Sequence, residues 1–194
     1  MKVLMLVREF NHGEFVSEYC KQLAFSLAKN DNETHIVAFG NENFYEKIHE
    51  KIHVHRNPLI INCNNFFNWA MMMNNELKRK AREIFETEGF DIIHGNDWIT
   101  FPAAVSIAKL TEKPLVMTIH STEKERGFAA EFSSLIEDLE WWSTYEARHV
   151  FVNNWSTYYV LKYDFGVPEI KMNMIDQSQK DWCEKIIETY RRLL

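Results

Sequence analysis

The chain has 194 residues, 46% of them hydrophobic and 14% aromatic, which is enough to bury the core of one ordinary domain. Its formal net charge of −6 argues against a general nucleic-acid-binding surface. No segment approaches eighteen consecutive apolar residues, and the apolar run at the N-terminus is too short for a signal peptide, so we expect neither a membrane span nor export.

The first predicted elements form a strand, a helix and a second strand. Lys2 to Val7 is an apolar run typical of a strand buried on both faces. An amphipathic helix follows, with apolar residues from Val16 to Leu27 at helical spacing, and Thr34 to Phe39 predicts the second strand. This spacing is that of one parallel crossover unit.

The middle of the chain continues the alternation after a less regular region from Gly40 to Asn65, which contains one possible strand near Ile52 to His55. A long helix is predicted from Phe66 to Glu88, ended by Gly89. Three strand–helix pairs follow, and their expected bounds are Asp91 to His94 with Ile99 to Leu110, Leu115 to Ile119 with Phe128 to Glu146, and His149 to Val152 with Trp155 to Phe165.

The tail is predicted to hold one more strand, Met172 to Ile175, and a final helix capped by Asp176. That helix carries an apolar stripe from Trp182 to Leu193, so we expect it to pack back on the domain. The pattern as a whole predicts an α/β fold, a three-layer, doubly wound, Rossmann-like parallel sheet.

Cysteine and glycine usage argues against metals and cofactors. Cys20, Cys63 and Cys183 have no metal-type spacing and cannot all pair, which favours a reduced, cytoplasmic protein. His49, His53 and His55 lie close together, but no cysteine or carboxylate spacing supports them as metal ligands. The sequence has neither GxGxxG nor GxxxxGK[ST], so we expect no dinucleotide and no P-loop chemistry.

Ligands of doubly wound sheets bind beyond the carboxyl ends of the strands. Three polar clusters stand at predicted strand ends, at Arg8 to Gly13, His94 to Trp98 and His120 to Arg126. Polar loops follow strands in any protein, but the combination of histidine, aspartate and tryptophan suits a sugar, whose ring stacks on an indole while its hydroxyls take hydrogen bonds.

Each candidate residue also has a structural explanation, and the sequence leaves both open. His120 either works in a site or only ends a strand, and Asp97 binds a sugar, caps the next helix, or does both. Trp98 offers a stacking face or packs in the core. Arg126 and Lys124 either face an anionic phosphate or belong to a solvated loop.

Residues 91–127 and 136–175 carry the motifs HxxDW, TIHSTE, EWWxTYEA and FGVP. From Met1 to about Ile175 the chain resembles the N-terminal domain of retaining glycosyltransferases of the GT-B fold, of the glycogen and starch synthase type in its short archaeal or bacterial form. The resemblance implies an acceptor-side domain over residues 1–175, and residues 176–194 resemble the family's last segment, a helix that returns to this domain.

The resemblance also implies residue roles. His120 corresponds to the histidine that contacts the donor sugar near the reacting carbon, and Asp97 and Trp98 correspond to the acceptor-side pair. Glu123 and Arg126, on the same loop as His120, are expected to bind substrate as well.

Two departures from the family pattern limit the expected activity. The loop after the first strand has only Gly13 where the family has a glycine pair near the donor phosphate, and Glu14 and Phe15 stand beside it. We also expect the donor-binding domain to be missing. The functions left open are an acceptor-side lobe inactive alone, a glucan- or sugar-binding module, an acceptor subunit that works with a separate donor-domain protein, and an interaction role with homodimer formation.

Overall fold

The strand β1 (Lys2–Glu9) carries an unbroken apolar run that is buried on both faces, which places it inside a sheet. It pairs in parallel with β2 (Glu33–Phe39) and with β5 (Ile92–Asn96). The computed structural model describes residues 1–127 and 131–194, in which eight strands follow the order β3-β4-β2-β1-β5-β6-β7-β8. The other strands are β3 (Phe44–His49), β4 (Ile52–Asn57), β6 (Leu115–Ile119), β7 (His149–Val152) and β8 (Met172–Met174).

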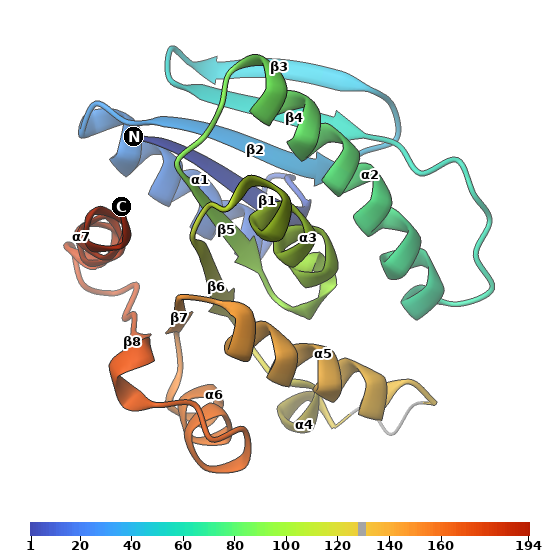
Figure 1. Ribbon diagram of the computed structural model, residues 1–194, viewed down its shortest axis with the longest axis vertical. Coiled ribbons are helices and arrows are strands. Elements are labelled where there is room, and N and C mark those ends of the chain that lie inside the picture. Colours follow the sequence, from blue (N-terminus) through green and yellow to red (C-terminus); the bar gives the residue numbers. More distant parts are fainter. Residues whose placement is uncertain (128–130) are drawn as a thin grey trace.

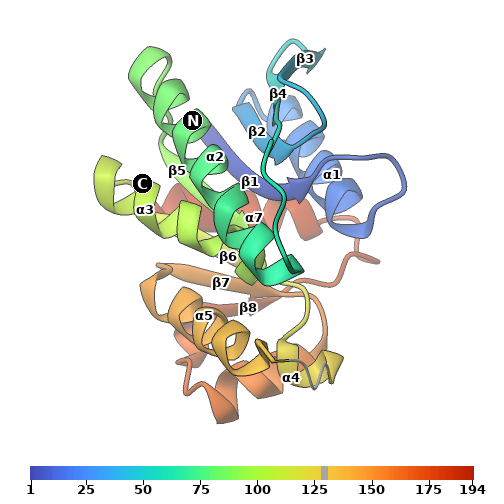
Figure 2. The same ribbon diagram turned by 90° about the vertical axis from the view of Figure 1, so that its right-hand side faces the viewer.

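Helices cover both faces of this sheet, as Figures 1 and 2 show. The α-helices of the described residues are α1 (Phe15–Lys29), α2 (Phe66–Thr87), α3 (Phe101–Thr111), α4 (Glu123–Arg126), α5 (Ser133–Glu146), α6 (Trp155–Tyr159) and α7 (Trp182–Leu193). Helices α2, α3 and α5 bury their apolar sides in one core cluster, and α1 and α7 bury theirs in a second cluster across the sheet. Short 3₁₀ segments lie at Trp98–Thr100 and Glu169–Lys171, and a π-helical turn at Val160–Asp164. The expected three-layer α/β fold is confirmed.

The last helix packs back on the domain. Ile186, Ile187 and Tyr190 of α7 are fully buried in the core that α1 shares with the sheet, and the Trp182 ring stacks on Tyr19 at 5.0 Å between centroids. Burial of four large side chains stabilises this twelve-residue helix, which would be marginal in isolation.

A buried polar chain links α7 to the sheet. The ring of His94, in the middle of β5, hydrogen bonds to the Tyr190 hydroxyl through Nδ1, and its Nε2 lies 2.7 Å from Thr118 Oγ1 on β6. Thr118 in turn lies 2.9 Å from the Tyr19 hydroxyl. Desolvation lowers the pKa of His94 to about 3, so the ring is neutral. His94 is therefore a core residue, although it begins the HxxDW motif.

The structure corrects several predicted elements. A six-residue edge strand, β3, lies in the region expected to be irregular and pairs antiparallel with β4, where it satisfies main-chain groups that would otherwise form an open edge. Asp176 does not cap the last helix, since its carboxylate instead accepts hydrogen bonds from Ser178 in a turn, and α7 begins at Trp182.

The helix expected from Phe128 to Glu146 is observed as α5, Ser133–Glu146, and residues 128–130 lie outside the described residues. A separate short helix, α4, precedes the expected start and was not predicted. On α5, Ile136 is buried, whereas Leu135 and Trp142 are exposed. No helix in the described ranges is long and apolar enough to cross a membrane.

Candidate active site

Strands β1 and β5 are neighbours at the point where the sheet begins to grow in the other direction. From β1 the chain adds β2, β3 and β4 on one side, and it then returns to place β5 on the other side of β1. Such a switch point leaves a crevice beyond the carboxyl ends of the two strands. A cavity of about 660 Å³ lies there. Its lining residues come from the loops after β1, β5 and β6 and from the start of α2, and they include Arg8, Glu9, Glu14, Phe66, Asp97, Trp98, Ser121, Glu123 and Arg126.

Asp97 joins the ends of β5 and β6. Its main-chain N–H donates to the Thr118 carbonyl at 2.9 Å, and its carboxylate accepts the main-chain N–H of His120 at 2.7 Å. The backbone of Asp97 has φ +56° and ψ 171°, which L-residues rarely adopt. Its side chain makes no capping bond to the following helical turn, so the alternative of an N-cap is wrong. Asp97 instead fixes where the two loops leave the sheet.

The His120 ring is buried, with 8% of the residue exposed. Nδ1 lies 3.0 Å from the Asn153 amide nitrogen, which makes it the acceptor, and Nε2 lies 3.3 Å from the Asn96 side-chain oxygen. The rings of Phe15 and Tyr19 pack edge-on against it at 5.5 and 4.9 Å. Burial lowers the pKa of His120, so the ring is neutral. Both ring nitrogens have protein partners, and in the described chain His120 lies beside the cavity rather than lining it.

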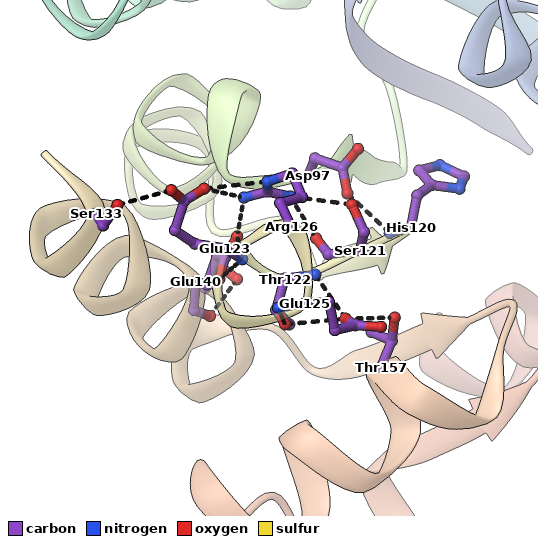
Figure 3. A network of polar contacts seen from close by, with 11 residues as sticks. Asp97, His120, Ser121, Thr122, Glu123, Glu125, Arg126, Ser133, Glu140 and Thr157 are labelled. Carbon is purple, nitrogen blue, oxygen red and sulfur yellow. Dashed lines mark hydrogen bonds and ion pairs between the residues drawn. The ribbon is translucent and has the colours of Figure 1, made fainter. Parts of the chain in front are cut away.

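Arg126 has all five of its N–H donors engaged by the protein (Figure 3). Nε and Nη2 donate to one oxygen of Glu123 at 3.0 and 2.9 Å, and Nη2 also donates to Glu140 at 2.7 Å. Nη1 donates to the carbonyl and hydroxyl of Ser121 at 2.8 and 3.0 Å. A phosphate could gain these donors only by displacing Ser121 or a carboxylate, so Arg126 shapes the loop after β6.

Glu140 on α5 completes the hydrogen-bond network of Glu123 and Arg126. Its carboxylate accepts the main-chain N–H of Glu123 at 2.9 Å in addition to the Arg126 bond, and only 1% of the residue is exposed. Burial raises the pKa of Glu140 to about 7, against the opposing hydrogen bonds from Glu123 and Arg126. Glu140 is the first residue of the EWWxTYEA motif, but the sequence did not assign it to the site, because its partners belong to another loop.

Within the TIHSTE motif, Thr122 serves as a helix cap. The Thr122 side chain caps α4, and the Glu125 carboxylate returns to the Thr122 N–H at 2.7 Å, which completes a capping box. Glu125 also accepts the hydroxyl of Thr157 at 2.8 Å. Lys124 pairs with Asp164 at an exposed position, as the solvated-loop interpretation expected.

Trp98 is largely a packing residue. It is 6% exposed, and its indole stacks on Phe67 at 6.0 Å and 14° between ring planes. Phe67 stacks in turn on Phe132 at 4.9 Å. Phe66, which meets Trp98 edge-on, is 53% exposed. The aromatic surface that a ligand can reach in this cavity therefore belongs mainly to Phe66, which the sequence analysis did not single out.

The loop after β1 turns at Gly13, whose φ of +87° favours glycine. The main-chain N–H of Gly13 donates to the Glu18 carboxylate at 3.3 Å, so this amide is already engaged by the protein. Glu14 lies on the cavity wall. The cavity thus holds four carboxylates, from Glu9, Glu14, Asp97 and Glu123, against two guanidinium groups.

A crevice at the switch point of a doubly wound sheet is where such folds bind their ligands, and this one is lined by carboxylates and exposed aromatic surface. Residues 16–176 match the model of the Glycosyltransferase Family 4, and the chain belongs to that family. An uncharacterized glycosyltransferase of Methanocaldococcus jannaschii is 32% identical over 168 residues, which are 84% of this chain and 42% of that protein. The chain therefore spans about two fifths of this relative.

Solved glycosyltransferases share the fold. A chain of sucrose-phosphate synthase from Thermosynechococcus elongatus, matched over 99% of its length and 100% of this chain, gives a TM-score of 0.68 at 14% identity. A longer chain of that synthase gives 0.72 at 13% identity, with 90% of this chain and 47% of that one covered. A lipopolysaccharide outer core galactosyltransferase gives 0.60 at 10% identity, over 91% of this chain and 45% of its own.

Proposed function

We propose that this chain is the acceptor-side lobe of a glycogen- or starch-synthase-like glycosyltransferase and that its cavity at the β1–β5 crevice binds a neutral sugar acceptor. The observation that carries the proposal is the balance of four carboxylates to two guanidinium groups on the cavity wall, with every donor of Arg126 already engaged. Carboxylates accept hydrogen bonds from sugar hydroxyls and repel phosphates, so this wall favours an acceptor over a nucleotide sugar.

The same features support the proposal that the chain alone transfers no glucose from a nucleotide sugar. The Gly13 amide faces Glu18 rather than open space, and both His120 ring nitrogens are occupied. In a complete enzyme His120 would contact the donor sugar, and that contact would require release from Asn96 or Asn153. Alone, the chain supplies an acceptor wall and a histidine, but too few donors for a pyrophosphate.

Binding of maltoheptaose, followed by calorimetry, tests the acceptor role. We expect a saturable isotherm for maltoheptaose and none for ADP-glucose or UDP-glucose. Phe66→Ala should weaken maltoheptaose binding at least tenfold, because Phe66 is the exposed ring of the cavity, whereas Phe44→Ala removes an equally exposed phenyl ring on β3 and serves as the control. Tighter binding of a nucleotide sugar than of maltoheptaose would contradict the proposal.

Incorporation of labelled glucose into a glycogen primer tests the absence of transfer. We expect none from ADP-glucose or UDP-glucose with the purified chain, and turnover above the no-protein control would overturn this part of the proposal.

A second candidate, the acceptor subunit of a two-chain glycosyltransferase, is favoured by Phe15. This side chain is 56% exposed at the rim while its ring packs edge-on against His120. An apolar side chain at that position is suited to being covered by a second lobe. Co-purification of a donor-domain protein that is lost in Phe15→Asp would support this candidate, and a homodimer that dissociates in the same variant would favour self-association.

A further inference from the structure

A cluster of imidazole and carboxylate groups lies at the amino-terminal ends of β2 and β4. The cavity lies at the other edge of the sheet, where the parallel strands end. Glu33 and His35 on β2, with His53 on β4, place one ligand atom each within 4.8 Å of the others. His35 and His53 are register partners on neighbouring strands, and their rings stack at 4.8 Å. We propose that Glu33, His35 and His53 form a zinc-binding site that joins β2 to β4.

Two distances within the cluster fit one tetrahedral ion. Oε1 of Glu33 lies 3.2 Å from Nε2 of His35 and 3.5 Å from Nε2 of His53. Ligand atoms about 2.0–2.1 Å from zinc in a tetrahedron are separated by ~3.3 Å from one another. The two rings are stacked with 10° between their planes, so binding one ion requires them to rotate until their Nε2 lone pairs converge.

Both imidazoles are already oriented through their other nitrogen. Nδ1 of His35 lies 3.2 Å from Nε2 of His55, and Nδ1 of His53 lies 2.7 Å from the Tyr45 hydroxyl. Zinc-bound histidines characteristically hold their second nitrogen in such a hydrogen bond, which fixes the tautomer and aims the free nitrogen at the metal. Here the two Nε2 atoms both face Glu33, and a zinc ion would replace the hydrogen bond that His35 Nε2 makes to this carboxylate.

The surroundings leave room for a fourth ligand and a route of entry. Oε2 of Glu88, at the end of α2, lies 3.5 Å from Nε2 of His35, and its side chain is 43% exposed. Lys2 lies 3.5 Å from Oε2 of Glu33, so it balances that oxygen while Oε1 faces the histidines. Zinc at this position would tie β2 and β4 to the end of α2, as a structural ion rather than a catalytic one.

Zinc titration of the untagged, chelator-treated full chain tests this site. We expect one zinc per chain by competition with a chromophoric chelator, and strong visible bands of tetrahedral cobalt when cobalt is used instead. Zinc at about 100 times its Kd should raise the Tm by roughly 5 °C or more, because the ion binds only the folded chain.

Matched variants separate the site from adventitious binding. His53→Gln and Glu33→Gln should each lower zinc affinity at least tenfold and abolish the Tm rise, and Tyr45→Phe should weaken affinity less, since it removes only the partner of Nδ1. His49→Gln, on the exposed end of β3, should leave affinity unchanged. Circular dichroism of each variant confirms folding. Absence of stoichiometric binding, which a purely hydrogen-bonded cluster predicts, or equal affinity in the His53 and His49 variants would overturn the proposal.

Discussion

The carboxylate of Asp97 accepts the main-chain N–H of His120 at 2.7 Å, across the ends of two adjacent strands. This bond couples the HxxDW loop to the TIHSTE loop, and it depends on a backbone at Asp97 with φ +56°. Two of the four motifs that carry the family resemblance are therefore joined in one structural unit, which fixes the main chain of His120 beside the cavity.

Asp97→Ala should destabilise the chain by about 2–4 kcal/mol, because it removes a charge-assisted hydrogen bond and places alanine at a positive φ. Asp97→Gly loses the same bond but adopts this backbone without strain, so it should be more stable than the alanine variant by about 1 kcal/mol. Urea unfolding measures both. Equal stabilities would mean that the backbone conformation relaxes in the variants.

Arg126→Met should destabilise the chain by about 3 kcal/mol, because it leaves Glu123 and Glu140 buried without their cation. Adding Glu140→Gln to this variant removes one of the two uncompensated carboxylates. We therefore expect the double variant to be more stable than Arg126→Met alone, in a double-mutant cycle measured by denaturant unfolding. Additive losses would show that the two residues are not energetically coupled.

Acid should destabilise the chain through its buried histidines. The pKa of His94 is lowered to about 3 by desolvation, whereas an unfolded histidine titrates near 6.5, so the unfolded chain binds more protons between these values. The contribution of His94 to stability is therefore fully present above about pH 6.5 and is lost as the pH falls toward 3, by about 1.4 kcal/mol per pH unit.

Unfolding free energies between pH 4.5 and 6 measure this slope. His94→Gln should reduce it by about 1.4 kcal/mol per pH unit, since the titrating group is gone. Tyr190→Phe removes the hydrogen bond to His94 but leaves the His94 ring buried. This variant should therefore be less stable while the slope with pH persists. An unchanged slope in His94→Gln would contradict the attribution of this pH dependence to proton binding by His94 in the unfolded chain.

Trp98→Ala should destabilise the chain by about 3–5 kcal/mol, because the indole is buried against Phe67. Phe66→Ala, at an exposed ring of the same cavity wall, should cost less than about 1 kcal/mol. Thermal unfolding of the two variants distinguishes a packing residue from a ligand-accessible one. A small loss of stability in Trp98→Ala would contradict the packing role and would favour the alternative, in which the indole stacks on a sugar.

The sequence was informative wherever a local pattern decides structure. The apolar run of β1 and the helical stripe of α1 predicted the parallel crossover, and Gly89 predicted the end of α2. The edge strand β3 escaped prediction because its residues are mostly exposed, so no burial pattern marks them. The capping role of Asp176 was wrong because a turn to Ser178 competes for its carboxylate.

The candidate site shows the same division more sharply. The motifs placed His120, Asp97, Glu123 and Arg126 at one rim, since parallel strands end at one edge of a sheet. Only the tertiary structure supplied Glu140 and Asn153 as their partners and filled every donor of Arg126. It also brought His53 of β4 beside Glu33 and His35 of β2. Periodicity is a local property of the sequence, so the sequence determined the sheet and the residues at its rim. Hydrogen-bond partners and charge balance depend on residues that meet only after folding. The tertiary packing therefore decided which groups at the rim are left to bind a ligand.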